Sequence, residues 1–247
     1  MPCRIARARE WSVRMLHEMS CHEASVFVTL TYNDENLPPD GSLQKRDLQL
    51  FWKRLRKALR GRKIRYYACG EYGEDTGRPH YHAICFGDLG NSISGDCEYN
   101  KAWGKGFVKV GSVTYDSCRY VAQYIDKKYN GDKAKEVYGD RQPPFQVCSQ
   151  GIGKQWALEN AEYLKQNLGC TVKGKKVGLP RYYRKLLDIS KDDLMELSLE
   201  AERKEKEIYA EKGFVTESEY LHREKESREQ NLENIKARLS IKKRNKI

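Results

Sequence analysis

The stretch KIRYYACGEYGEDTGRPHYHAICFG, Lys63–Gly87, decides the fold. Its first part, Lys63–Gly73, and its last part, His80–Gly87, are both rich in apolar and aromatic residues, so each predicts a strand. The residues EDTGRP between them include glycine and proline, which are typical of a turn. Because strands joined by so short a connection pair in opposite directions, the stretch predicts the centre of an antiparallel sheet.

Segments on either side predict the rest of this sheet and its helices. Ser25–Tyr32 is β-branched and aromatic, which predicts a strand, and strand signals return in Gly106–Val113. Apolar residues recur at helical spacing in residues 4–19, from Leu43 to Arg60, and from about Ser117 to Tyr129. We therefore predict an α+β fold with a central antiparallel sheet and flanking helices that lie on one of its faces.

Two later segments are assigned from composition. GDKAKEVYGDRQPPF, residues 131–145, predicts a loop, whereas GKQWALENAEYLKQN, residues 153–167, predicts a helix. From Ser190 onward glutamate and lysine dominate, Gly213 interrupts the pattern, and TESE from Thr216 forms a capping box that opens a second helix. We predict one folded domain at 1–189 and a charged helical extension at 190–247, with coiled-coil pairing of the extension as a weaker alternative.

The charge of the chain is unevenly distributed. The formal net charge is +11, and residues 191–247 carry 14 basic and 14 acidic side chains, so the whole excess belongs to residues 1–190. A basic folded region favours a polyanionic partner such as nucleic acid, because neutralising phosphates releases counterions. The basic outer face of the helix between Leu43 and Arg60 fits DNA contact and plain solvation equally well.

The remaining composition points to an intracellular protein. The 8 cysteines form no C-x-x-C pair, which argues against a zinc ribbon and favours buried thiols in a reducing compartment. No apolar run approaches the length of about 18 residues that crosses a membrane, and the N-terminus is too charged for a signal peptide. We expect no membrane partner and a cytoplasmic location.

His80 and His82 lie one residue apart in the strand after the turn. Because side chains alternate along a strand, both imidazoles point to the same face, which suits joint coordination of a metal ion. A histidine pair alone is more often incidental, so a third ligand matters. GEYGE offers Glu71 and Glu74, of which Glu71 is better placed at the end of the preceding strand. Such a set leaves open positions on a divalent ion for a substrate oxygen.

The second group of candidate residues lies in RYVAQYIDKKY, Arg119–Tyr129. At about 100° per residue, Tyr120, Tyr124 and Lys127 share one stripe of a helix whose other side is mostly apolar. A tyrosine, with an ordinary pKa near 10, needs a nearby cation and a polarised electrophile to act as a nucleophile. A lysine and a metal-bound phosphate would supply both. The alternative is that the rings cover the edge of the core and Lys127 is solvated.

The order of these motifs resembles a known superfamily. An FVTLTY-like strand, then PHYH, then YVAQYIDKK is similar to the three motifs of HUH rolling-circle replication initiators. The whole of residues 4–190, which is most of the chain, further resembles the initiators of microviruses, especially the gokushovirus group. The pieces that carry this likeness are REWSVRMLHE, FVTLTYNDENLP, ACGEYGEDTGRPHYHAICFG, RYVAQYIDKKY, GIGKQW and GLPRYYRKLL.

The resemblance implies roles for particular residues. His80 and His82 would bind a divalent ion, Mg²⁺ or Mn²⁺, with Glu71 as our choice of third ligand. Tyr120 and Tyr124 would be the paired nucleophiles of initiation and termination. Lys127 would be the accompanying lysine, with Lys128 as its substitute, and Lys128 and Arg119 are our candidates for DNA contact. Because Lys127 is near Tyr124 in the helix, we expect Tyr124 to attack first.

The implied activity is site-specific nicking and joining of single-stranded origin DNA through a 5′-phosphotyrosine intermediate that leaves a 3′-hydroxyl primer. No G-x-x-x-x-G-K-[ST] loop is present, so a host helicase and the host replication machinery would be needed as partners in the bacterial cytoplasm. Two alternatives remain open. One is a plasmid-type initiator, relaxase or transposase of the same superfamily; the other is a non-enzymatic nucleic-acid-binding protein with structural histidines.

Overall fold

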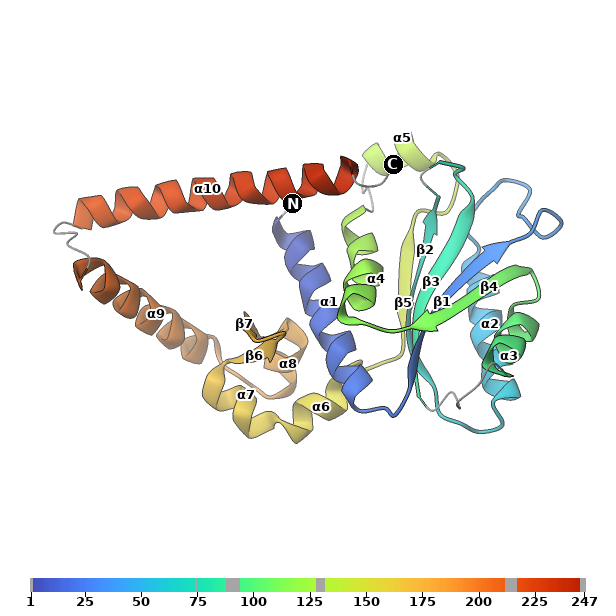
Figure 1. Ribbon diagram of the computed structural model, residues 1–247, viewed down its shortest axis with the longest axis horizontal. Helices are drawn as coiled ribbons and strands as arrows, with labels where there is room; N and C mark the ends of the chain where they lie inside the picture. The colour runs from blue at the N-terminus through green and yellow to red at the C-terminus, as the bar shows by residue number, and fades with distance from the viewer. Residues whose placement is uncertain (1, 74, 88–93, 128–131, 212–216, 245–247) are drawn as a thin grey trace. The chain divides into compact units, whose positions relative to one another are not determined.

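The computed structural model describes residues 2–73, 75–87, 94–127, 132–211 and 217–244, in two units, Met1–Asp188 and Ile189–Ile247. Figure 1 shows a sheet with helices on both sides in the first unit and two helices in the second. The elements of the first unit are α1 (Pro2–Ser20), β1 (Ser25–Tyr32), α2 (Lys45–Ala58), β2 (Arg65–Tyr72), β3 (Pro79–Phe86), α3 (Ser94–Trp103), β4 (Gly106–Ser112), α4 (Tyr115–Lys127), α5 (Asp132–Tyr138), β5 (Phe145–Cys148), α6 (Lys154–Glu159), α7 (Ala161–Asn167), β6 (Gly169–Val172), β7 (Lys175–Gly178) and α8 (Arg181–Leu186).

The main sheet has five strands in the order β4-β1-β3-β2-β5, and every neighbouring pair is antiparallel. The predicted α+β class and the antiparallel pair at its centre, β2 with β3, are therefore confirmed. A separate two-stranded sheet, β6 with β7, was not predicted. Its strands are four residues each, too short to show a clear alternating pattern in the sequence.

Helices cover both faces of the main sheet, so the prediction of helices on one face is wrong. In β3, Tyr81, Ala83 and Cys85 pack with α2 and α3 in one hydrophobic cluster. Ile84 and Phe86 point the other way and pack with α1 and α4 in a second cluster. A strand that is apolar on both faces needs a layer on each side, and this signal was present in the sequence.

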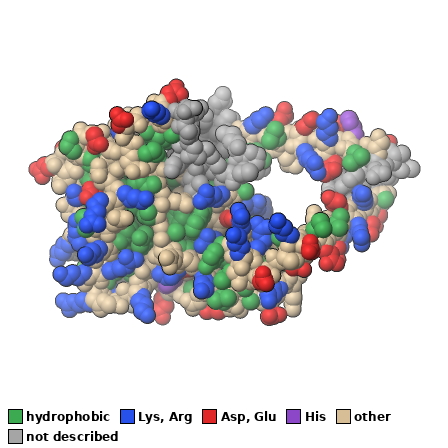
Figure 2. Space-filling model, turned by 180° about the vertical axis from the view of Figure 1, so that it is seen from behind, with side chains coloured by type: hydrophobic (Ala, Val, Ile, Leu, Met, Phe, Trp, Pro, Cys, Tyr) green, Lys and Arg blue, Asp and Glu red, His purple; other side chains and the backbone are tan. Residues whose placement is uncertain are grey.

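The predicted helix between Leu43 and Arg60 is confirmed as α2, whose buried residues fall at helical spacing. Its outer face is basic, and Figure 2 shows lysine and arginine side chains gathered over this part of the surface. The exposed basic residues of this face are Lys53, Arg54, Arg56, Lys57 and Arg60.

Two assignments in the second half of the first unit need correction. The segment predicted as a loop contains α5, a short helix whose Tyr138 is buried and packs near Tyr72. The single helix predicted for residues 153–167 is divided into α6 and α7 at Asn160. The Asn160 side chain donates a hydrogen bond to the Trp156 carbonyl, and its backbone leaves the helical region there. Asparagine commonly competes with helix continuation in this way.

A buried glutamate ties the second half of the first unit to α1. Glu18 accepts a 2.6 Å hydrogen bond from the Gly153 N–H, and its other oxygen accepts from Arg65 and from His22. We call these four residues the Glu18 cluster. Beside it, His17 stacks on Trp156 with ring centroids 3.5 Å apart. The cluster joins α1, β2 and the start of α6, three segments far apart in the sequence.

The second unit consists of α9 (Lys191–Glu211) and α10 (Glu217–Arg244). At its start, Ser190 and Asp193 exchange hydrogen bonds between side chain and backbone N–H, a capping box that begins α9. The predicted box from Thr216 and the break at Gly213 lie outside the described residues. Two helices after Ser190 are observed as predicted.

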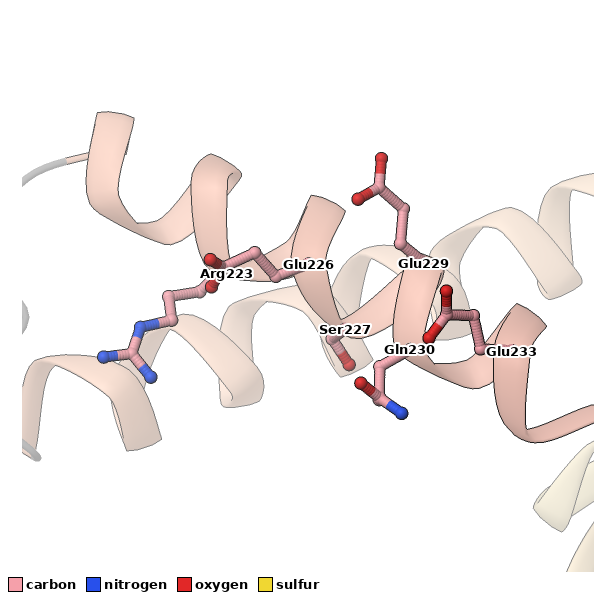
Figure 3. A pocket seen from close by; sticks show the side chains of 6 residues that line it. All are labelled: Arg223, Glu226, Ser227, Glu229, Gln230 and Glu233. Carbon is pink, nitrogen blue, oxygen red and sulfur yellow. The ribbon is translucent and has the colours of Figure 1, made fainter.

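A surface depression lies on α10 of the second unit. Figure 3 shows a depression whose lining side chains all come from α10, so a single helix surface forms it. Within the described ranges, no helix is both long and apolar enough to span a bilayer. The depression is lined by Arg223, Glu226, Ser227, Glu229, Gln230 and Glu233.

Candidate functional site

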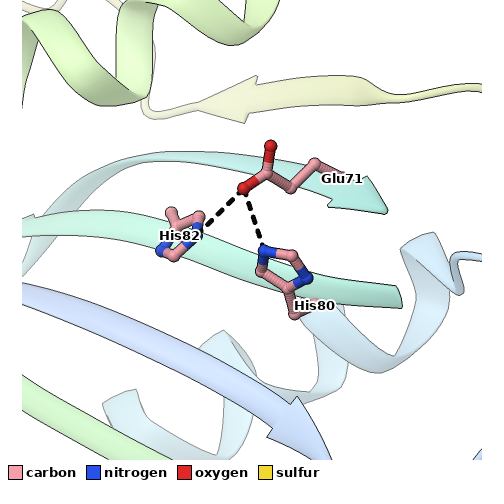
Figure 4. Close-up of side chains that lie close together, drawn as sticks. All are labelled: Glu71, His80 and His82. Carbon is pink, nitrogen blue, oxygen red and sulfur yellow. Dashed lines mark hydrogen bonds and ion pairs between the residues drawn. The ribbon is translucent and has the colours of Figure 1, made fainter. Parts of the chain in front are cut away.

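Strand register brings a carboxylate to the histidine pair. Glu71 on β2 lies directly opposite His80 on β3, and His82 lies two residues farther along the same face. The Nε2 atoms of His80 and His82 lie 2.9 Å and 3.1 Å from the same atom, Oε1 of Glu71, as Figure 4 shows. One ligand atom from each residue lies within 4.8 Å of the others. The alternative ligand, Glu74, lies outside the described residues.

Further contacts orient the two imidazoles. His80 Nδ1 lies 3.1 Å from the Arg78 carbonyl, and because a carbonyl only accepts, this nitrogen is the donor. His82 Nδ1 lies 3.0 Å from the Thr29 hydroxyl on β1. Each Nε2 is thereby left pointing toward Glu71. In metal-binding histidines the other ring nitrogen is likewise hydrogen-bonded to a protein group, which fixes the ring orientation. Sequence reasoning missed Thr29, although it belongs to the FVTLTY strand on which the resemblance was based.

The Glu71 carboxylate is held in its charged form. Its side chain is only 9% exposed, and this burial by itself would raise its pKa. Hydrogen bonds from His80 and His82 outweigh the burial and hold the pKa of Glu71 below its ordinary value. A charged carboxylate beside two imidazoles is a donor set that suits a divalent transition metal such as Mn²⁺ and also accepts Mg²⁺.

Both candidate tyrosines of α4 lie against the histidines. The ring of Tyr120 has its centroid 5.2 Å from that of His82, and the ring of Tyr124 is stacked on His82 at 5.8 Å. The two tyrosine rings meet edge to face at 5.0 Å. The two tyrosines of the predicted helical stripe therefore lie against the histidine pair, while Cys118 and Ala122 of α4 pack in the adjoining core.

The two tyrosines differ in exposure. Tyr120 is 39% exposed, whereas Tyr124 is 5% exposed and belongs to the hydrophobic cluster under α1 and α4. Burial raises the pKa of Tyr124, and the negative charge of Glu71 raises it further. Tyr120 thus has an open side from which a phosphate can approach, while Tyr124 lies in the protein interior beneath it.

Of the three basic residues named from the sequence, the structure describes the side chain of Arg119 alone. Lys127 is the last residue of α4, but its side chain is outside the described set, as is the whole of Lys128. Arg119 is exposed, lies 3.8 Å from Asp116 as an ion pair, and approaches the ring of Tyr115. The structure therefore groups Glu71, both histidines and both tyrosines, and leaves Arg119 on the outer surface of α4.

The relatives found by comparison with known proteins all carry the description replication-associated protein. Residues 25–129 match the family model of replication-associated protein ORF2/G2P. The chain is 34% identical over 209 residues to replication-associated protein VP4 of Bdellovibrio phage phiMH2K, covering 74% of this chain and 64% of that protein. It is 32% identical over 229 residues to replication-associated protein ORF2 of Spiroplasma virus 4, covering 83% and 71%.

A third relative, replication-associated protein ORF4 of Chlamydia phage 1, is 28% identical over 213 residues. The aligned regions span between 53% and 71% of the lengths of these three relatives. No solved structure matches the chain. The resemblance inferred from the motifs is confirmed by these matches: the chain belongs to the family of phage replication-associated proteins typified by ORF2/G2P.

Proposed function

We propose that this protein nicks and rejoins single-stranded DNA at a replication origin, using a divalent metal ion and a tyrosine nucleophile, and so initiates and terminates rolling-circle replication. The observation that carries the proposal is the convergence of Glu71, His80 and His82 on one point, with the ring of Tyr124 stacked on His82 and the ring of Tyr120 edge-on to it. The family membership supports a role in phage DNA replication. Residues 1–189 would form the catalytic domain.

The protein residues have separate tasks in this proposal. Glu71 and the Nε2 atoms of His80 and His82 would hold Mg²⁺ or Mn²⁺, which supplies Lewis-acid polarisation of the scissile phosphate. Arg78 and Thr29 keep the imidazoles in the required orientation through their Nδ1 contacts. Lys127 would be the lysine that favours the phenolate, and Arg119 and Lys128 would contact the DNA backbone.

The proposed reaction is a transesterification. The tyrosine oxygen forms a bond to phosphorus while the bond from phosphorus to the 3′ oxygen breaks. The phenolic proton is released and the departing 3′ oxygen takes up a proton, which leaves a 3′-hydroxyl and a 5′-phosphotyrosine. Attack on that linkage by a 3′-hydroxyl reverses the exchange and joins strands, so no nucleotide cofactor is consumed.

We propose that Tyr120 makes the first attack. The expectation that Tyr124 does so rested on Lys127, whose side chain is outside the described residues. The exposure of Tyr120, 39% against 5% for Tyr124, makes its side chain the more accessible of the two to DNA. Tyr124 would act second, after the first covalent linkage has displaced Tyr120 from above it.

The experiment is a denaturing gel of the protein with labelled single-stranded oligonucleotides that tile the genome encoding it, in Mn²⁺. We expect a protein-linked DNA band that chelator abolishes and that disappears in the double variant Tyr120→Phe with Tyr124→Phe. Tyr120→Phe alone should reduce the band from the first cleavage more than Tyr124→Phe does. His80→Ala combined with His82→Ala should remove it.

Tyr163→Phe is the matched control, because Tyr163 is 43% exposed on α7, outside this site. A covalent band that persists in the double tyrosine variant would assign the nucleophile to another residue. Salt-sensitive binding that survives chelator, with no covalent product on any oligonucleotide, would instead favour a non-enzymatic binding protein. Separation of a long duplex should require an added helicase, the proposed host partner.

A further inference from the structure

Strand β4 presents an aromatic residue to solvent. Val108 and Val110 point toward α2 and α3 and pack against the core there. Because side chains alternate along a strand, Phe107 and Lys109 point to the opposite face, where both are exposed. Phe107 is 69% exposed, the largest value among the large apolar side chains of the described residues. A single exposed apolar side chain is ordinary, so what Phe107 does depends on the residues that share its face.

This exposed pair lies on the face that carries the candidate metal ligands. Phe107 on β4 is opposite Thr31 on β1, which is opposite His80 on β3. In the next row on the same face, Lys109 is opposite Thr29, which is opposite His82. Directly opposed residues of antiparallel strands share a face, so these rows run from the metal ligands to the sheet edge. Phe107 and His80 are two strand spacings apart, about 10 Å.

The chemistry of the pair fits one kind of ligand. Exposed aromatic rings beside basic side chains are the usual elements of single-stranded nucleic-acid binding, where bases stack and phosphates pair with cations. Among the described residues, Lys109 forms no ion pair, so its ammonium group is available to a phosphate. An edge strand can also pair with a second copy of the chain, but the lysine and the continuity with the metal ligands favour DNA.

A glycine keeps this part of the face open. Gly111 follows Lys109 on the same face, in the row of Phe27. A Cβ added at Gly111 would meet nothing within 4 Å, and its φ is not in the left-handed region, so folding does not require glycine there. A glycine inside a strand often marks a place where another chain approaches the backbone closely.

We propose that Phe107 stacks on a base of the single strand that flanks the scissile phosphate, and that Lys109 binds a phosphate of the same strand. This rests on the proposed function, because it takes the strand at the metal ligands as its starting point. Phe107 and Lys109 are then DNA-positioning residues: they hold the strand across β4 and β1 and do not touch the reacting atoms.

Binding is measured first in EDTA, to separate it from cleavage, with fluorescein-labelled oligothymidylate as the probe. Phe107→Ala should weaken binding about tenfold, as expected for loss of one base–aromatic stack. Phe107→Trp should bind as wild type does and show quenched tryptophan fluorescence on binding. On an oligodeoxyribose phosphate that lacks bases, wild type and Phe107→Ala should bind equally.

Charge and space are tested separately. Lys109→Ala should lower the slope of log affinity against log salt by about 0.7, the value for one phosphate of a single strand. Gly111→Asp places a carboxylate on the open face without strain and should weaken binding to a similar extent as Lys109→Ala. The matched controls are Tyr163→Ala, an exposed aromatic on α7, and Lys101→Ala on α3 at the opposite face; both should bind as wild type.

The outcomes distinguish this inference from the proposed function. If wild type forms the chelator-sensitive covalent band and Phe107→Ala binds the probe normally, the stacking role is wrong and the nicking function stands. If wild type neither binds oligothymidylate nor forms a covalent band on the genome tiles, both are wrong. If Phe107→Ala converts a dimer to a monomer on size exclusion without changing affinity for DNA, Phe107 is a protein–protein contact and the inference fails.

Discussion

Two buried glutamates of the first unit have contrasting surroundings. Glu18, whose side chain is 4% exposed, accepts from the Arg65 guanidinium and from the Gly153 backbone N–H. Glu71, 9% exposed, accepts from the imidazoles of His80 and His82. An arginine stays charged and a backbone amide keeps its proton at any ordinary pH, whereas an imidazole nitrogen can give up its proton to bind a metal.

This difference separates a structural carboxylate from one suited to chemistry. Two of the three donors to Glu18, the Arg65 guanidinium and the Gly153 backbone N–H, cannot be exchanged for a metal ion, and only His22 contributes an imidazole, so the cluster mainly ties its three segments together. The donors around Glu71 are themselves metal ligands, and a divalent ion can take the place of the protons between them. Burial and hydrogen-bond donors are thus shared features, and the kind of donor decides which glutamate can serve a reaction.

The largest predicted effect is on stability, at Glu18. Glu18→Gln should lower the free energy of unfolding by about 3 kcal/mol, because it leaves the Arg65 charge without its partner in a partly buried position. Urea denaturation measures this. Glu71→Gln is the matched control and should cost less than about 1 kcal/mol while abolishing Mn²⁺ binding in a calorimetric titration. Equal losses of stability at the two positions would contradict the contrast drawn between them.

His17, the neighbour of Glu18, should make the free energy of unfolding depend on pH. Burial lowers the pKa of His17 to about 4 in the folded protein, while the unfolded chain keeps the ordinary value near 6.5. Since the unfolded state therefore binds a proton first, stability is fully present above pH 6.5 and is lost as the pH falls toward 4. The loss should reach about 3 kcal/mol.

This is checked by urea denaturation across that pH range. The reference variant combines His17→Phe with Tyr183→Phe, since His17 Nδ1 lies 3.1 Å from the Tyr183 hydroxyl and neither polar atom is then left alone. The double variant keeps an aromatic ring against Trp156 and should lose less stability than wild type between pH 6.5 and 4. Parallel pH curves for the two proteins would show that His17 does not titrate as described.

A smaller effect is expected from the contact behind His82. Thr29→Val keeps the shape of the side chain but removes the hydroxyl 3.0 Å from His82 Nδ1. The affinity for Mn²⁺ should fall about tenfold, the lower end of the range for losing a hydrogen bond to a metal-ligating histidine. Thr29→Ser should restore the affinity. Thr31→Val, on the same strand and face, is the control and should bind Mn²⁺ as wild type does. Unchanged affinity in Thr29→Val would remove Thr29 from the site.

The smallest effect is expected from the second unit. A chain that ends at residue 189 should cleave a short oligonucleotide at the wild-type rate, because every candidate site residue lies in the first unit. Replication in the host should decrease if the extension recruits a partner. Loss of oligonucleotide cleavage, with an unchanged circular dichroism spectrum for the first unit, would instead make the extension part of the catalytic domain.

Much of the site was predictable because it depends on local periodicity. Strand alternation placed His80 and His82 on one face, and the helical repeat placed Tyr120 and Tyr124 on one stripe; both are observed. Glu71 was chosen for its place at the end of the preceding strand, and it is the carboxylate that the structure brings to the histidines. These features follow from backbone geometry, which repeats every 2 residues in a strand and every 3.6 in a helix.

By itself, then, the sequence determined the antiparallel centre of the sheet, the shared direction of the two histidines and the tyrosine stripe. Only the tertiary structure decided that helices cover both faces, that Thr29 supports His82, and that Tyr120 is exposed while Tyr124 is buried. It also decided that Glu18 of α1 hydrogen-bonds to β2 and to the start of α6. The physical reason is that short-range periodicity follows from bond geometry, whereas neighbours distant in the chain are selected by burial and by the pairing of polar groups across the whole fold.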